Sequence, residues 1–123
     1  MTHRSELLDY AGQLLDGSIN LGARGARTAA LLTRCALEDW LDDQSAPWSG
    51  TPGPRPTTRS KLVVLGALRG PETGEHAKRA WHDLSRACHH HAYELQPSIT
   101  EIRQLLHQVR RLIAPAAENR PGS

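Results

Sequence analysis

The stretch from Trp81 to Leu95, WHDLSRACHHHAYEL, decides the fold and carries most of the recognisable chemistry. Positions at alternating spacings of three and four residues run through and just before it: Ala77, Trp81, Leu84, Cys88, His91 and Leu95. That spacing is one face of an α-helix, so we expect one long helix over residues 72–95. His91 lies on the face that should be buried, and a polar ring there needs a partner or a function.

Four other segments also have helical patterns. Leucine and alanine supply most of the apolar positions, the chain has no Phe, and these residues favour helices over sheets. We predict helices over residues 5–16, 20–43, 59–69 and 99–113, with Asn20 as one cap and Ser98-Ile99-Thr100-Glu101 as a capping box. A strand over residues 61–68 is the alternative to the third of these helices, but a lone strand would have nothing to pair with.

Proline and glycine mark the remaining segments. Residues 44–58 contain four of the eight prolines together with two glycines, which predicts a surface loop without helix. Residues 114–123 are expected to form a disordered tail. The prediction is therefore an all-α protein with a single domain over residues 1–113. Its architecture would be an antiparallel up-and-down four-helix bundle with one additional short helix.

Composition excludes several classes of protein. With 15 basic and 13 acidic side chains the net charge is +2, too small to indicate a nucleic-acid partner by itself. Cys35 and Cys88 fall within predicted helices, and we expect both to be buried and reduced rather than joined in a disulfide. The chain has no apolar run after its first charges and no window approaching the roughly 18 apolar residues of a membrane span. We therefore expect a cytoplasmic protein without a membrane partner.

The histidine triplet does not predict a metal site. Consecutive helical residues project about 100° apart, so His89, His90 and His91 cannot converge on one ion within a single chain. A dimer could bring two triplets together, but we predict no metal and no cofactor. Motifs for a nucleophilic serine or a phosphate-binding glycine loop are also missing from the sequence.

An arginine, histidines and a tyrosine remain as candidates for chemistry. On a straight helix Arg86, His90 and Tyr93 share one face, and His89 lies to one side of it. The arginine fork suits a phosphate, a histidine can exchange a proton near neutral pH, and a tyrosine can stack on a base. This set suits metal-free cleavage of an RNA phosphodiester. The plainer interpretation is a solvated helix face, with His91 as a hydrogen-bonded core histidine.

The residues Arg86 to Tyr93 spell R-x4-H-x-Y, which resembles the signature of HEPN-domain proteins. These are small helical domains of prokaryotic toxins, antiphage systems and RNA-processing enzymes. The alanine-rich run that ends in Ala36-Leu37-Glu38 is similar to a second helix of such domains. The resemblance covers residues 21–112.

The resemblance implies a homodimer that places two copies of Arg86 and His91 in one cleft and cuts RNA without a metal, leaving a 2′,3′-cyclic phosphate. Tyr93 matches a position that a partner nucleotidyltransferase antitoxin can modify. Ala87 departs from active members, which often carry a polar residue there. That departure favours an alternative, a non-catalytic module for dimerisation or partner binding. A DNA-binding regulator is a third hypothesis, supported only by Arg103, Arg110 and Arg111.

Overall fold

The computed structural model describes residues 3–49, 57–89 and 98–114. All of the secondary structure in these three ranges is helical, as predicted, and the strand alternative for residues 61–68 is wrong. The helices are α1 (His3–Asp16), α2 (Gly25–Ser49), α3 (Thr58–Arg69), α4 (Pro71–Cys88) and α5 (Ile99–Ile113), with a short 3₁₀ helix, η1 (Gly22–Arg24), before α2. The predicted tail after residue 114 lies outside the described residues.

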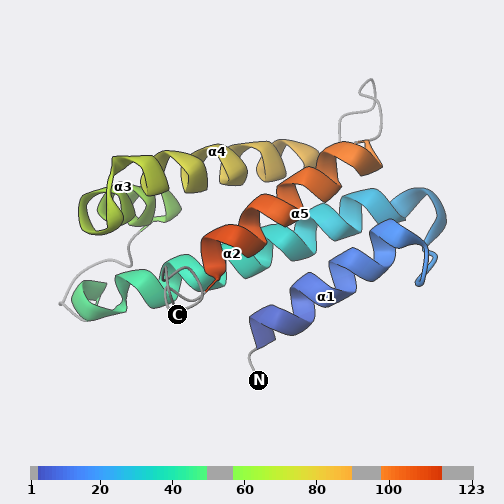
Figure 1. The fold of residues 1–123 in the computed structure, drawn as a ribbon, viewed down its shortest axis with the longest axis horizontal. Helices are drawn as coiled ribbons and strands as arrows, with labels where there is room; N and C mark the ends of the chain where they lie inside the picture. Colours follow the sequence, from blue (N-terminus) through green and yellow to red (C-terminus); the bar gives the residue numbers. More distant parts are fainter. Residues whose placement is uncertain (1–2, 50–56, 90–97, 115–123) are drawn as a thin grey trace, which may run out of the picture.

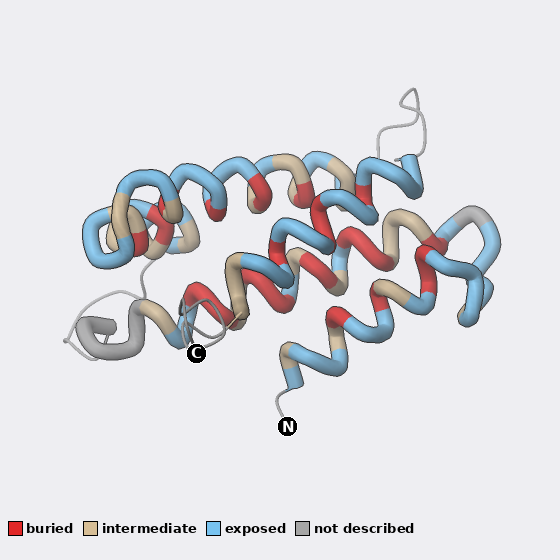
Figure 2. The backbone as a smooth tube through the Cα atoms, in the orientation of Figure 1, coloured by how far each residue is buried: buried red, intermediate tan, exposed pale blue. Residues whose placement is uncertain are grey.

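Helix α2 is the element around which the others pack. It contacts each of the other four α-helices, whereas α3 contacts only α2 and α4. Figure 1 shows α1 and α5 alongside α2, with α4 above α5 in this view and α3 at one end of the molecule; α4 also packs directly on α2. The buried faces point toward this shared interior (Figure 2). Its largest fully buried side chains are those of Leu37, Leu41, Leu65, Leu84, Ile102, Val109 and Thr33.

The one buried polar side chain among these shows how the interior satisfies its hydrogen bonds. Thr33 is fully buried in α2, and its Oγ1 donates to the carbonyl of Ala29 at 2.8 Å. The hydroxyl therefore needs no partner from another helix, because the preceding turn supplies the acceptor.

Local capping chemistry sets several helix ends where the sequence predicts them. The Asp16 side chain accepts from the Ser18 N–H at 2.8 Å, and Gly17 follows α1 with φ 88°. Ser98 accepts from the Glu101 N–H at 3.4 Å and begins α5, as the capping box predicts. Asn20 accepts from the Gly22 N–H at 2.7 Å just before η1, whose N-cap residue is Leu21, so the prediction that Asn20 caps α2 is wrong.

The predicted loop over residues 44–58 is wrong at its N-terminal end. Helix α2 continues to Ser49 and includes Pro47, and α3 already begins at Thr58. Proline in a helix loses one hydrogen bond and crowds the preceding turn, which is why its presence normally predicts an end. Here it lies in the last turn of α2, close to where the helix stops. Residues 50–56 lie outside the described part of the chain.

Helices α3 and α4 form a tight antiparallel hairpin. Thr57 caps α3 by accepting from the Ser60 N–H at 3.1 Å. A single residue, Gly70, joins the two helices; its φ of 106° is a conformation that glycine adopts without steric cost. The helices then touch through two glycines, because a Cβ added to Gly74 would lie 2.6 Å from the Cα of Gly66.

Two arginines of α5 connect that helix to α1. Arg103 donates to the carbonyl of Leu15 and Arg110 to the carbonyl of Leu8, both at 3.2 Å. These contacts satisfy backbone oxygens of another helix and so fix how α5 lies along α1. The DNA-binding hypothesis requires both arginines to be free to bind DNA. These hydrogen bonds to α1 therefore weaken that hypothesis.

Candidate functional site at the end of α4

The chain leaves the helical conformation before it reaches most of the predicted site. Helix α4 ends at Cys88, and the next residue, His89, is extended at φ −76° and ψ 134°. The His89 N–H still donates to the Ser85 carbonyl at 3.1 Å, which closes the last turn. The prediction of one continuous helix over residues 72–95 is therefore wrong at His89, and residues 90–95 lie outside the described part of the chain. The periodic spacing continued to Leu95, but periodicity carries no signal for where a helix stops.

The structure describes two of the five predicted site residues. Arg86 and His89 lie in the described range, both exposed, whereas His90, His91 and Tyr93 lie outside it. Whether the predicted arginine and histidine come together therefore stays a prediction. The expected burial of His91 on the helix seam lies outside the described residues for the same reason.

Arg86 presents its guanidinium to solvent in the last turn of α4. Its side chain is 73% exposed, and Nη2 donates to Asp83 Oδ1 at 2.8 Å. The pair is separated by three residues on one helix, and exposed pairs of this kind contribute about 1 kcal/mol or less. A phosphate group could therefore displace Asp83 at small cost.

A polar cluster that the sequence analysis did not single out lies between α2 and α4. We define it as Arg34, Glu38 and Trp81. The Trp81 Nε1 donates to Glu38 Oε2 at 3.1 Å, and the Arg34 Nε donates to the same oxygen at 3.4 Å. The Arg34 guanidinium also lies 5.7 Å from the centre of the Trp81 ring, within range of a cation–π contact.

The sequence did hold a signal for this cluster. Arg34 and Glu38 are four residues apart in α2, the spacing of a helical ion pair. Trp81 was assigned to the apolar seam of α4, yet an indole N–H that is partly buried usually has an acceptor. The sequence does not show that Trp81 of α4 lies next to Arg34 and Glu38 of α2.

Two thiols flank the polar cluster. Cys35 in α2 is exposed, which corrects the expectation that it is buried, and Cys88 at the end of α4 is half-buried. Burial raises the pKa of the Cys88 thiol, partly opposed by the nearby Arg34 guanidinium. Partial desolvation of the otherwise exposed thiol and the Glu38 carboxylate raise the pKa of Cys35. Both thiols are therefore mostly protonated at neutral pH and are poor nucleophiles.

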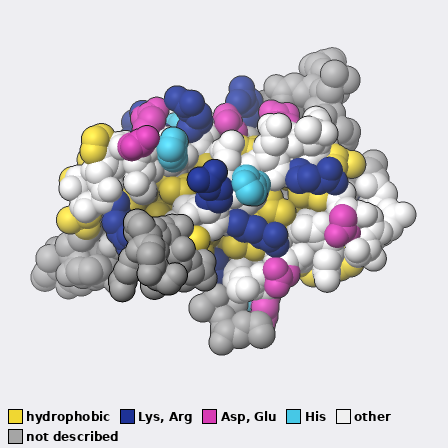
Figure 3. Space-filling view, viewed as in Figure 1, with side chains coloured by type: hydrophobic (Ala, Val, Ile, Leu, Met, Phe, Trp, Pro, Cys, Tyr) yellow, Lys and Arg dark blue, Asp and Glu magenta, His cyan; other side chains and the backbone are white. Residues whose placement is uncertain are grey.

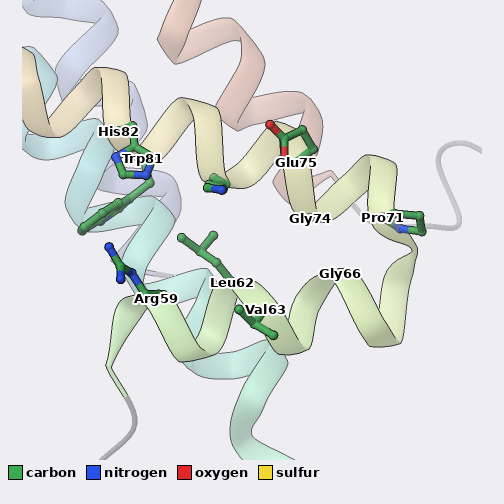
Figure 4. Close-up of a pocket in the computed structure, with 10 residues that line it drawn as sticks. Arg59, Leu62, Val63, Gly66, Pro71, Gly74, Glu75, Trp81 and His82 are labelled. Atoms are coloured by element: carbon green, nitrogen blue, oxygen red, sulfur yellow. The ribbon is translucent and has the colours of Figure 1, made fainter.

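A groove between α3 and α4 adjoins the polar cluster. Its volume is about 440 Å³, and one side of it is formed by Trp81, His82 and Arg59 (Figure 4). The rings of Trp81 and His82 meet edge to face, with their centres 5.3 Å apart. The Trp81 side chain therefore belongs to both features, because its N–H donates to Glu38 of α2 and its ring lines the groove between α3 and α4.

Metal ligation finds no support in the described part of the chain. Within it, no three His, Cys, Asp or Glu side chains are arranged so that they could hold an ion. None of the helices over those residues is both long enough and apolar enough to cross a bilayer.

No family model matches the chain, and comparisons with curated proteins and with solved structures find no significant similarity. The described residues therefore define a small all-α protein with an exposed arginine at a helix end and a polar cluster behind it. The function must be argued from these features and from the sequence motif.

Proposed function

We propose that the protein is a HEPN-like, metal-independent endoribonuclease of the toxin or antiphage-defence type. In this proposal a cytoplasmic homodimer of up-and-down four-helix bundles brings two copies of Arg86 and His91 into one cleft. Arg86 binds the scissile phosphate. His91, or its neighbour His90, moves the proton as the ribose 2′-hydroxyl attacks the phosphorus and the 5′-oxygen leaves, giving a 2′,3′-cyclic phosphate.

The observation that carries this proposal is the R-x4-H-x-Y pattern beginning at Arg86. The exposure of the Arg86 side chain supports it, because a phosphate ligand must be reachable from solvent. The weak pairing with Asp83 supports it too, since the guanidinium fork can change partners at small cost. A nucleotidyltransferase that modifies Tyr93 would be the matching antitoxin.

The test is RNA cleavage by the purified protein in EDTA. We expect Arg86→Ala and His91→Ala each to reduce the cleavage rate at least about a hundredfold, in the range of an acid–base or phosphate-binding residue. Arg24→Ala, at an exposed arginine of η1, is the charge-matched control and should cleave like the parent. Circular dichroism should show the same helix content for all variants. Cleavage at the parental rate by both motif variants would reject the assignment.

The alternative is a non-catalytic module for dimerisation or partner binding. Ala87 is the specific observation that favours it, because active members of the family that the motif resembles often carry a polar residue directly after the arginine. The Asp83→Asn variant distinguishes the nuclease from the non-catalytic binding module. A nuclease should bind and cut RNA better once the competing charge is removed. A binding module should remain inactive on RNA.

A further inference from the structure

A pocket with an unusual charge distribution lies at the opposite end of α4 from Arg86. Four α-helices contribute to it: α2, α3, the N-terminal half of α4 and the C-terminal end of α5. Its volume is about 570 Å³. We call it the basic pocket and define it by Trp40, Arg69, Thr73, His76, Arg79 and Arg111. Lysine, arginine and histidine side chains gather over α4 and α5 on the face seen in Figure 3.

Little in the pocket offsets the positive charge of its arginines. None of the described side chains that line it is an aspartate or glutamate. Arg69 donates to the neutral oxygen Oε1 of Gln44 at 2.6 Å, so its charge is not neutralised. Arg79 has Glu75 at 3.9 Å, an exposed pair of little strength. Arg111 has no carboxylate partner within the described ranges.

Three arginines that line one pocket place like charges near one another, and an anion bound in the pocket would offset their repulsion. Arginine forks bind phosphate oxygens through paired, charge-assisted hydrogen bonds. Three arginines suit a group with more than one negative charge, such as a phosphate monoester. The Thr73 hydroxyl adds a neutral hydrogen-bonding group beside them.

The pocket also has an apolar part. Trp40, which is 5% exposed, lines it together with Leu112 of α5, whereas His76 and Gln108 add further polar groups. A cavity with an apolar wall, a few polar groups and a volume between about 300 and 1,000 Å³ is typical of small-molecule sites. A bare inorganic anion would leave the apolar wall uncovered.

We propose that the basic pocket binds a small organic phosphate monoester. Its phosphoryl group lies among Arg69, Arg79 and Arg111, and its organic part packs against Trp40 and Leu112. The proposal does not depend on nuclease activity, because none of these residues belongs to the R-x4-H-x-Y motif.

The test is isothermal titration of the full-length protein with AMP, adenosine, inorganic phosphate and a short single-stranded RNA. We expect AMP to bind with a Kd below about 1 mM and more tightly than adenosine or phosphate. Arg79→Gln and Arg111→Gln should each weaken AMP binding at least about tenfold, the usual loss for a charged hydrogen bond. Arg24→Gln, the control outside the pocket, should bind AMP like the parent. Melting curves establish that each variant is folded.

Four results would overturn the proposal. Equal binding of adenosine and AMP would show that the phosphoryl group is not recognised. Binding of inorganic phosphate as tightly as AMP would show that the apolar wall is not used. Binding of the RNA without AMP would assign the arginines to a nucleic-acid strand instead. Loss of AMP binding in Arg86→Ala would place the ligand at the other end of α4.

Discussion

Substituting alanine at Gly74 tests the close contact between α3 and α4, the tightest found at any described glycine. The new Cβ would lie 2.6 Å from the Cα and 3.0 Å from the N of Gly66. Ordinary contacts at this position would be about 3.4–4 Å, so α3 and α4 must separate by roughly 1 Å. The atoms in the way belong to the backbone, which cannot move aside by changing rotamer. Gly74→Ala should therefore strain or open the α3–α4 hairpin.

The magnitude follows from two opposing effects. Overpacking of this kind costs about 3 kcal/mol at the upper end of its usual range, whereas replacing glycine by alanine in a helix returns up to about 1 kcal/mol. The net loss in the free energy of unfolding is about 2 kcal/mol. For a chain of this size that corresponds to a Tm roughly 8 °C lower.

Gly66→Ala is the matched control, because it adds the same methyl group to the other side of the same contact. Its Cβ would lie 3.8 Å from the Cα of Gly74, an ordinary van der Waals distance. We expect it to keep the parental Tm or to raise it by up to about 4 °C through helix propensity. The assay is thermal unfolding followed by circular dichroism. Equal Tm shifts for the two variants would refute the argument from the close approach.

Two further predictions concern the contact between α2 and α4. Trp81→Phe removes the hydrogen bond to Glu38 and should lower the free energy of unfolding in urea by about 1.5 kcal/mol. This effect should largely disappear when Glu38→Leu, which has no acceptor, is already present. Equal losses in both backgrounds would contradict this coupling. Burial raises the pKa of Cys35 and Cys88 above the ordinary value of 9.0, so above that pH the unfolded chain releases protons that the folded chain keeps. The cysteines' contribution to stability is therefore present below pH 9.0. It is lost as the pH rises through the pKa that each thiol has in the folded protein. Replacing both by serine should reduce the fall in Tm between about pH 8 and about pH 10, and an unchanged fall would show that these thiols do not contribute.

The sequence predicted most helices because their signals are local. Ser98 accepts from the N–H group three residues ahead, and such a contact depends only on neighbouring residues. The end of α3 at Gly70, just before Pro71, was equally predictable from neighbouring residues. From the sequence, the two glycines at the contact between α3 and α4 could be recognised only as weak helix formers. Position 74 requires glycine because the backbone of α3 packs against it, and the sequence does not show that contact.

Two of the wrong helix ends have different causes. At Pro47 the local rule predicted an end too early, whereas α2 extends to Ser49. After Cys88 no local signal predicted an end, yet α4 stops there. The polar cluster was missed for a third reason. Its contacts join residues 43 positions apart, and periodicity identifies a buried face without identifying the helix that covers it.

The early end of α4 changes how the candidate catalytic residues must be compared. On an ideal helix His90 shares a face with Arg86, whereas His91 lies about 140° away, and this geometry favoured His90 over the motif position. That argument requires a continuous helix from Arg86 through His91. The helix stops at Cys88 and His89 is already extended, so helical geometry no longer ranks the two histidines. The motif alone then favours His91. Comparing His90→Ala with His91→Ala in the cleavage assay therefore tests the motif position: a loss confined to His90→Ala would assign the proton transfer to His90 and contradict the R-x4-H spacing even if the protein cuts RNA.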